Sequence, residues 1–339
     1  MRIEQFNPVT DSLQLRACHR MLEAAKPADD PNGPPISLPG FTGWWGVGWN
    51  GDPRETWLAT DVSGEAVGCY LLELPELDNT KVGGLLPLVA VSRRRSGTGR
   101  ALLRHAAGRA AQAGRTLLRG DTAAESPGAA FARACGARRG LIEVRRLLDV
   151  TALPADHLRR LRGTAEPAAA GYSLVSWQGP VPDDYLGQVA TINEAMADAP
   201  RHAGEEAQYW DAARVVASDR RVTAQGIRLY SVAARCDTTG ELAALTQLGV
   251  DPEHPAWGFQ ELTAVTRPHR GHRLGLLVKV AMLELLAVRE PQISRVITGN
   301  TDTNEHMIAI NAALGFQVLD QWVSWDLEVA DAARAGSPA

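Results

Sequence analysis

VSRRRSGTGRALLRHAAGRAAQAG, residues 91–114, places an arginine trio and two glycines directly before a stretch with the composition of a helix. The first turn of a helix leaves backbone N–H groups without partners, and the aligned peptide dipoles make that end positive. A glycine turn that leads into a helix is therefore typical of a site for an anion such as phosphate or pyrophosphate. We therefore expect this turn to bind a phosphate or pyrophosphate group.

The composition is that of a globular protein with more than one domain. The chain has 339 residues, of which 45% are hydrophobic, so it can bury a large core, and its length favours two domains over one. Its 35 Lys and Arg against 39 Asp and Glu give a formal net charge of −4. Because no basic field is available to attract nucleic acid, we expect no nucleic-acid partner.

The sequence also argues against a membrane and a metal. The apolar run at 274–288 is interrupted by Lys279 and Glu284, and the N-terminal residues MRIEQF lack a hydrophobic signal core. The four cysteines form no CxxC pair and no ligand spacing with histidine. We therefore expect a cytoplasmic protein without a membrane segment, a disulfide framework or a metal site.

The predicted order of elements occurs twice. Each half is predicted to begin with a strand, followed by helical segments, further strands and a turn that opens a helix. In the first half these are a strand at 2–6, a helix at 13–25, a Pro- and Gly-rich loop at 26–40, and strands at 56–62, 64–75 and 85–91. In the second half they are a strand at 172–177, helical segments at 182–197 and 205–219, and strands at 229–236, 241–250 and 259–265. Aligning Gly99 with Gly275 places Arg94 against Arg270, as expected of a duplicated domain.

We therefore predict two tandem domains, at 1–150 and 172–330. The stretch at 151–171 is rich in Pro, Ala and Arg and is predicted to be a linker or connecting helix. Residues 331–339 are predicted to be a disordered tail. The predicted class is α+β, with a mixed sheet in each domain.

The segments RRSGTGRALL and RGHRLGLLVK, followed by NTDTNEHMIAINAALGF, resemble the GNAT superfamily of N-acetyltransferases. The resemblance covers nearly the whole chain as two copies. In this tandem arrangement the chain is similar to the GNAT enzymes of actinobacteria, and distantly to mycothiol synthase. The family signature is Q/R-x-x-G-x-G/A. The first copy matches it at Arg94, Gly97 and Gly99; the second has Arg270 and Gly275 but carries Arg273 at the middle glycine. The resemblance implies two tandem GNAT folds, each a twisted mixed sheet flanked by helices, and acetyl-CoA as the acyl donor.

The resemblance assigns three kinds of residue to acetyl-CoA: those of the two turns, those of the strand before the second turn, and one asparagine near the end of the second copy. In the first copy they are Val91, Arg94, Arg95, Ser96, Gly97, Thr98, Gly99 and Arg100. In the second copy they are Thr263, Val265, Arg270, Gly271, His272, Arg273, Leu274, Gly275 and Asn304. Backbone N–H groups suit the pyrophosphate of coenzyme A, and small residues let the backbone approach it closely.

Some of these residues have alternative interpretations. If Arg273 needs a positive φ, a residue other than glycine costs roughly 1 kcal/mol there, whereas at a negative φ its guanidinium can meet a phosphate. Asn304 matches the family asparagine that binds the pantetheine arm, and a helix N-cap is the alternative. His269 and His272 frame the second turn and either contact phosphate or are solvated loop residues.

Acetyl transfer from a thioester to an amine needs a base for the amine proton and polarisation of the thioester carbonyl. The second copy offers Glu261 in FQELTAV, with Thr263 and Val265 on the same face by strand alternation. The first copy has Leu85 at the equivalent position. We therefore expect the C-terminal domain to be catalytic and the N-terminal domain to be a degenerate or regulatory copy. The alternative is that Glu261 pairs with an arginine across the sheet.

The position of the family's general acid provides the second catalytic candidate. The resemblance implies a tyrosine four residues before the glycine of LGF, and Asn311 occupies this position here. The first copy has Ala132 at the equivalent place. An amide does not donate a proton as a phenol does, so the proton source for the leaving thiolate stays unassigned.

The acceptor side is predicted from acidic residues that follow the first strand of the second copy. Asp198, Glu205 and Glu206 would hold a cationic amine, and an ordinary solvated helix face is the alternative. The predicted reaction moves an acetyl group from acetyl-CoA to the primary amine of a small cationic or amino-sugar-like metabolite. A peptide or protein amine acetyltransferase and a non-catalytic acyl-CoA sensor are the alternatives.

Overall fold

In the computed structural model, which describes residues 1–198, 200–202 and 204–335, the chain divides into two compact units. Unit 1 comprises the described residues of Met1–Ile142, His202–Glu206 and Gln321–Ala339. Unit 2 comprises those of Glu143–Arg201 and Ala207–Asp320. Each unit has a mixed sheet with helices on both faces, which confirms the predicted α+β class.

The sheet of unit 1 has the strand order β1-β2-β3-β4-β5-β12. Neighbouring strands are antiparallel except β4 and β5, which run parallel. The strands are β1 (Arg2–Phe6), β2 (Arg54–Thr60), β3 (Ala66–Glu73), β4 (Val82–Val89), β5 (Leu117–Ala123) and β12 (Gln317–Glu328).

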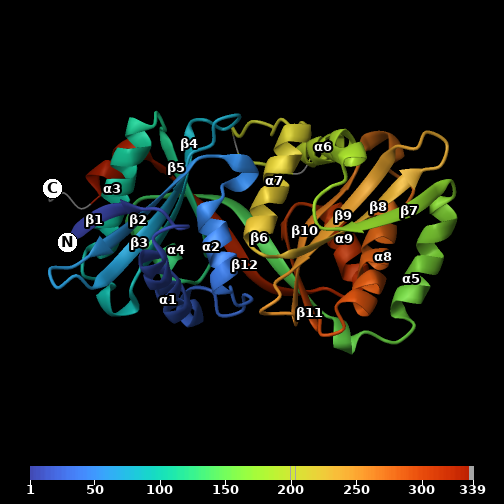
Figure 1. Ribbon diagram of the computed structural model, residues 1–339, viewed down its shortest axis with the longest axis horizontal. Helices are drawn as coiled ribbons and strands as arrows, with labels where there is room; N and C mark the ends of the chain where they lie inside the picture. The colour runs from blue at the N-terminus through green and yellow to red at the C-terminus, as the bar shows by residue number, and fades with distance from the viewer. Residues whose placement is uncertain (199, 203, 336–339) are drawn as a thin grey trace. The chain divides into compact units, whose positions relative to one another are not determined.

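Helices cover both faces of the unit 1 sheet (Figure 1). One face packs against α3 (Thr98–Gln112), α4 (Pro127–Ala134) and α10 (Val329–Arg334). The other face packs against α1 (Ser12–Asp29) and α2 (Leu38–Gly46). Both ends of the loop predicted at 26–40 are therefore helical, because α1 extends to Asp29 and α2 begins at Leu38.

The sheet of unit 2 repeats this plan with the order β6-β11-β10-β9-β8-β7. Its parallel pair is β10 and β11. The strands are β6 (Arg138–Asp149), β7 (Tyr172–Gln178), β8 (Arg228–Cys236), β9 (Leu242–Val250), β10 (Trp257–Val265) and β11 (Arg295–Thr301). The helices on one face are α5 (His157–Ala165), α8 (Leu274–Arg289) and α9 (Glu305–Leu314). Those on the other face are α6 (Leu186–Glu194) and α7 (Ala212–Ala224).

Each sheet receives its last strand from the opposite half of the sequence. In β12, Trp325 pairs with Gly120 of β5, and in β6, Leu148 pairs with Val296 of β11. The compact units therefore differ from the predicted ranges 1–150 and 172–330 in their closing strands. The strands β6 and β12 hold equivalent places in the repeat, and each pairs with the sheet formed by the other half of the sequence.

The predicted linker and tail both contain ordered helices. Within 151–171, α5 packs on α8, with Leu158 and Leu161 against the core of unit 2. Within the predicted tail, residues 331–334 continue α10, and Ala332 is fully buried against α3. Ala335 also belongs to this core, and residues 336–339 lie outside the described part of the chain.

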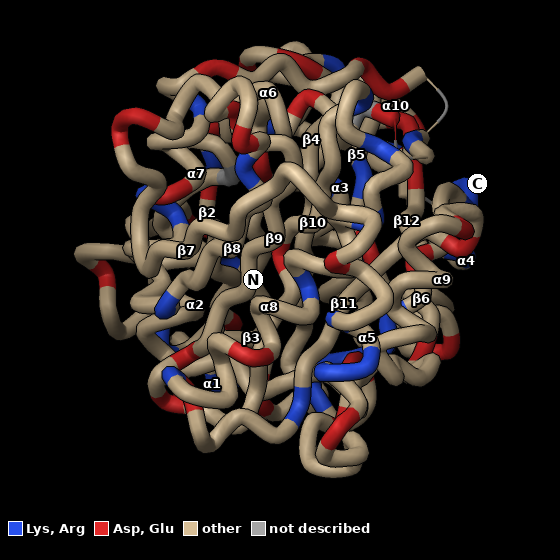
Figure 2. Tube along the Cα trace, turned by 90° about the vertical axis from the view of Figure 1, so that its right-hand side faces the viewer, with Lys and Arg blue, Asp and Glu red and all other residues tan. Residues whose placement is uncertain are grey.

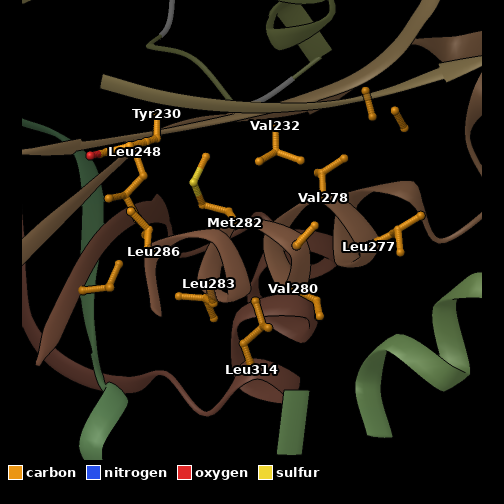
Figure 3. Close-up of a cluster of buried hydrophobic side chains, with 14 of the residues drawn as sticks. Tyr230, Val232, Leu248, Leu277, Val278, Val280, Met282, Leu283, Leu286 and Leu314 are labelled. Carbon is orange, nitrogen blue, oxygen red and sulfur yellow. The ribbon is translucent and has the colours of Figure 1, made fainter. Parts of the chain in front are cut away.

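The core of unit 2 is built around α8, which is apolar on nearly all sides. Figure 3 shows Val278, Met282 and Leu286 pointing toward β8 and β9, while Leu283 lies on the other side of the helix near Leu314 of α9. A helix that is hydrophobic all round is a buried helix. The N-terminus of α8, which follows the second signature turn, is thereby held in a fixed position against the sheet.

Lys279 is the buried charge in this helix. It is 3% exposed, its Nζ lies 5.3 Å from the centroid of the Phe316 ring, and burial lowers its pKa to about 7. The unfolded chain then binds more protons than the folded chain between pH 7 and the ordinary lysine pKa of about 10.4, so stability rises with pH across this window.

We expect Lys279→Met to raise the free energy of unfolding at pH 7 by about 1–3 kcal/mol, because it removes the cost of burying the ammonium. The variant should also flatten the rise in stability above pH 7. Urea unfolding of both proteins at pH 7, 8 and 9 measures this. Equal stabilities with parallel pH dependence would contradict it.

Acidic and basic residues are interspersed along the chain trace, in keeping with their near balance in the sequence (Figure 2). Among the described residues, no helix combines the length and apolar character needed to cross a membrane. In the same part of the chain, no group of three or more His, Cys, Asp or Glu residues is placed to hold a metal ion.

Candidate functional site

Both signature turns have the same backbone conformation. In unit 1, φ is +63° at Arg95 and +89° at Gly97; in unit 2, φ is +89° at Gly271 and +54° at Arg273. Glycine thus occupies the second of two left-handed positions in unit 1 and the first in unit 2. Neither Gly97 nor Arg273, the N-caps of α3 and α8, has a capping side-chain hydrogen bond, so the first N–H groups of both helices are available to an anion.

Arg273 therefore needs the positive φ that glycine would adopt more easily. The left-handed conformation costs such a residue about 1 kcal/mol or more. Its guanidinium Nη1 donates to the carbonyl oxygen of Thr164 in α5 at 3.1 Å, so the side chain braces the turn against α5. The second turn therefore keeps the left-handed backbone conformation of the first, although an arginine replaces its middle glycine.

The last glycine of each signature serves helix packing. A Cβ on Gly275 would lie 3.2 Å from Cδ1 of Ile310 in α9, and one on Gly99 would lie 3.2 Å from the ring of Phe131 in α4. In both units the missing side chain lets the next helix approach, and the role of these glycines toward the cofactor stays a prediction.

The signature arginines form the same clamp in both units. Arg94 binds Asp29 through two hydrogen bonds of 2.9 and 2.6 Å, and Arg270 binds Asp198 at 2.6 Å. Each also donates Nε to a carbonyl at the end of the preceding strand. Asp198 is bound by Arg267 as well, and the hydrogen bonds from Arg267 and Arg270 hold its pKa well below the ordinary range. Asp198, predicted to bind the acceptor, thus secures the turn.

The other two predicted acceptor residues belong to unit 1. Glu206 accepts a hydrogen bond from the backbone N–H of Asn79 at 2.8 Å, and Glu205 lies 3.5 Å from the guanidinium of Arg119 in β5. The helix predicted at 205–219 begins only at Ala212, so these glutamates lie before it. The structure therefore does not place Asp198, Glu205 and Glu206 in one cluster of the same unit.

The parallel strands separate within the strand that leads to each turn. β10 and β11 pair only from Trp257 with Arg295 to Phe259 with Ile297, although β10 continues to Val265. In unit 1, β4 and β5 likewise pair over three residues only. Beyond these pairs the facing backbone groups have no strand partner in the ladder, and the carbonyl of Leu262 in β10 accepts hydrogen bonds from side chains instead.

A β-bulge distinguishes the strand before the second turn. The register of β10 against β9 shifts between Gln260 and Leu262, which leaves Glu261 outside the ladder. The corresponding β4 of unit 1 pairs with β3 without a shift and contains Pro87, which has no N–H. Bulges re-aim side chains and are frequent beside active sites.

The bulge also changes the predicted orientation of side chains. Glu261 contacts Arg221 of α7, whereas Val265 packs against the core on the α8 face. Thr263 bonds the Thr246 hydroxyl of β9 at 2.8 Å. The prediction that alternation places Glu261 and Val265 on one face is therefore corrected.

Glu261 lies on the face covered by α6 and α7. Its side chain is 30% exposed, and Oε2 lies 3.7 Å from Nη2 of Arg221. An arginine partner is therefore present, but it comes from a helix and not from a neighbouring strand. Arg221 was missed in the sequence because its place opposite Glu261 depends on how α7 packs on the sheet.

Two asparagines of α9 lie on the other side of the sheet. Asn304 is the N-cap and its Oδ1 accepts the N–H of Met307 at 3.3 Å. Asn311 is fully buried, and its Nδ2 donates to Oδ1 of Asn300 in β11 at 2.7 Å. The Oδ1 of Asn311 has no hydrogen-bond partner, although an unmet buried acceptor costs about 1–3 kcal/mol.

The histidines of the second turn anchor it to β7. Nδ1 of His269 lies 2.8 Å from the Tyr172 hydroxyl, and Nδ1 of His272 lies 3.2 Å from the carbonyl oxygen of Ala168. The ring of His272 also packs on that of Tyr172. Both side chains therefore hold the loop in place.

The remaining predicted residues have local roles. Ser96 and Thr98 share a hydrogen bond of 3.1 Å, and Arg100 donates to the carbonyl oxygen of Ala134 at 3.0 Å. Val91 is exposed, whereas the side chain of Leu274 is 1% exposed and belongs to the core of unit 2.

Comparisons with known proteins agree with this geometry. No family model and no curated protein matches the sequence. Among solved structures, a tandem GNAT protein from the clavulanic acid biosynthesis pathway, determined without acetyl-CoA, has a TM-score of 0.78 and 28% identity over 100% of this chain and 99% of its own. A GCN5-related N-acetyltransferase from Sphaerobacter thermophilus has a TM-score of 0.67 and 15% identity, covering 97% and 95% of the two chains. A fungal glucosamine N-acetyltransferase region has a TM-score of 0.65 and 13% identity over 96% of this chain and 38% of its own. The chain therefore has the tandem GNAT acetyltransferase fold.

Proposed function

We propose that the chain is an acetyl-CoA-dependent N-acetyltransferase and that unit 2 carries out the reaction on the primary amine of a small metabolite. The observation that carries this proposal is the bulge at Glu261, which lies where β10 leaves β11, on the strand that leads into the turn before the uncapped start of α8. Along this stretch of chain, the separation of the strands after Phe259 is followed by the carboxylate of Glu261 and then by the proposed anion site at the start of α8.

The donor would be held mainly by backbone. In this proposal the N–H groups at the start of α8 bind the pyrophosphate, and the turn around Gly271 keeps them in place. Acetyl-CoA supplies the acetyl thioester. Asn304 retains an amide Nδ2 that can donate to the pantetheine arm, and the unpaired Oδ1 of Asn311 can accept a hydrogen bond from the thiol or an amide of that arm.

Unit 1 is proposed to be a degenerate or regulatory copy. It has the turn and the parted strands, but β4 has no bulge against β3 and Pro87 removes one backbone donor. In addition, the segment His202–Glu206 of unit 1 contacts β5 and β12. Glu205 forms an ion pair with Arg119 of β5, and a ring nitrogen of His202 lies 3.5 Å from the Ser324 hydroxyl of β12. These contacts reduce the room for an acceptor on that side of unit 1.

The acceptor is proposed to be a small amine. The similar structure from the clavulanic acid pathway belongs to the synthesis of a small molecule, which favours a metabolite over a protein acceptor. Mycothiol-type biosynthesis and antibiotic modification are two concrete settings for such an acceptor. A cytoplasmic location suits either setting.

The test is thiol release from acetyl-CoA, followed with a thiol reagent, with glucosamine, spermidine or a lysine-containing peptide as the added amine. We expect release that depends on one of the small amines, and a product heavier by one acetyl group in mass spectrometry. Release with the peptide alone would favour the peptide-acetylating alternative. Tight binding of acetyl-CoA without release for any amine would favour a sensor and contradict the proposal.

Glu261→Gln is expected to lower kcat by about 100-fold or more, because positioned general bases contribute at least this factor. Affinity for acetyl-CoA should stay unchanged in calorimetry. Glu253→Gln, an exposed glutamate elsewhere in unit 2, is the control. Unchanged turnover with an unchanged pH profile in Glu261→Gln would show that the carboxylate serves only as the partner of Arg221.

A further inference from the structure

Glu143 lies on β6, on the face of the unit 2 sheet that carries α6 and α7. Leu148 of β6 pairs with Val296 of β11, and both belong to the core against α8. Because side chains alternate between faces and this register has no shift, Glu143 and its partner Thr301 point to the opposite face. Glu261 lies on this same face.

The carboxylate of Glu143 rests against Gly299. A Cβ on Gly299 would come within 1.9 Å of Oε1 of Glu143, so the glutamate fills the space that a side chain at this position would need. The last pair of β10 with β11 joins Phe259 to Ile297, and Gly299 follows farther along β11. Glu143 therefore places a carboxylate beside β11 at the point where β10 and β11 have separated.

No group in the described part of the chain pairs with this carboxylate through a hydrogen bond or an ion-pair contact. Arg145, on the same face of β6, is bound to Asp320 through hydrogen bonds of 2.7 and 2.6 Å. Although solvent reaches the side chain, desolvation by the surrounding protein raises the pKa of the Glu143 carboxyl, and the nearby charge of Arg145 only partly opposes this. Such a group gains a partner when a cation binds beside it.

A second unpaired polar group lies next to Glu143. The hydroxyl of Thr301, its partner in the ladder, is buried and has no hydrogen-bond partner. Buried hydroxyl groups nearly always find a partner in protein or water. The carboxylate and the hydroxyl together offer the acceptors that an ammonium group with three N–H donors requires.

We propose that Glu143, with the Thr301 hydroxyl, binds a second cationic nitrogen of the acceptor, so that diamines and polyamines are the preferred substrates. This inference rests on the proposed N-acetyltransferase function. The nitrogen that attacks the thioester must be neutral, so a carboxylate that binds an ammonium recognises a different nitrogen of the same molecule. Hydrogen bonds to charged groups are worth about 1.5–3 kcal/mol, enough to select such acceptors about 10- to 100-fold.

The experiment compares α,ω-diaminoalkanes of three to six carbons with 1-aminoalkanes of the same lengths. We expect the wild type to prefer at least one diamine over its monoamine by about tenfold or more in kcat/KM. In Glu143→Gln this preference should disappear, mainly through a higher KM for the diamine. Glu253→Gln should retain it, and the affinity for acetyl-CoA should be the same in all three proteins.

Gly299→Ala supplies an independent test, because its Cβ would displace the Glu143 carboxylate without removing it. We expect a reduced preference for diamines and an unchanged affinity for acetyl-CoA. The inference is overturned if Glu143→Gln keeps the diamine preference, or if the wild type acetylates other amines but no diamine better than its monoamine. Failure of the proposed function has a different signature, since then no amine releases thiol from acetyl-CoA.

Discussion

Gly271→Asp is expected to lower the affinity for acetyl-CoA by about 100-fold relative to Gly271→Asn. Gly271 has a φ of +89° and open space around its Cα, and Asn and Asp both tolerate this conformation better than other residues. The two variants have nearly the same shape, so their difference measures the added charge alone. Two like charges about 4 Å apart near a protein surface repel by about 4 kcal/mol. Salt reduces this repulsion, but it stays large enough to account for a 100-fold loss of affinity.

Calorimetric titration of acetyl-CoA into both variants measures the effect, with Gly97→Asp and Gly97→Asn as the matched pair in unit 1. Gly97 has the same φ of +89° and equally open surroundings. If the pair at Gly97 separates and the pair at Gly271 does not, the donor binds in unit 1 and the assignment of the reaction to unit 2 is wrong.

Leu148→Ala is expected to destabilise unit 2 by about 2–5 kcal/mol, although this residue lies in the first half of the sequence. Leu148 is 1% exposed and packs in the core around α8. Hydrogen exchange followed by mass spectrometry should show faster exchange in peptides of α8 and β9. Peptides of α3 should exchange as in the wild type.

Trp325→Ala is the reciprocal variant. Trp325 comes from the second half of the sequence, is 7% exposed, and donates its indole N–H to the hydroxyl of Thr122 in β5 at 2.8 Å. Trp325→Ala should increase hydrogen exchange in peptides of α4, against which Trp325 packs, and leave exchange in α8 unchanged. If Leu148→Ala loosens α3 instead, β6 belongs to the sheet of its own half and the exchange of closing strands is wrong.

The repeat and the starts of the helices could be predicted from the sequence because they depend on residues that are close together along the chain. The turns at Arg94–Gly99 and Arg270–Gly275 are local, and alternation of apolar residues marks the strands that precede them. The tandem GNAT fold was predicted from the resemblance of these turns to the GNAT superfamily, and a similar tandem GNAT structure has this fold. Helix α2 was missed because its glycines and its proline suggest a loop, whereas burial of Phe41 and Trp45 stabilises a helix there.

Other features depend on pairing between distant segments. The bulge at Glu261 is a property of the register between β9 and β10, and residue types alone do not determine it. Glu143 was not a candidate because it stands in the first half of the sequence and reaches the unit 2 sheet only through β6. Asp198 and Glu205 are close in sequence but bind arginines in different units.

A crystal structure of the protein with acetyl-CoA would show which unit binds the donor. We expect electron density for the pyrophosphate at the N–H groups that start α8, and for the pantetheine arm between β10 and β11 beside the bulge at Glu261. Donor density confined to the turn before α3, with the arm between β4 and β5, would contradict it and assign the chemistry to unit 1.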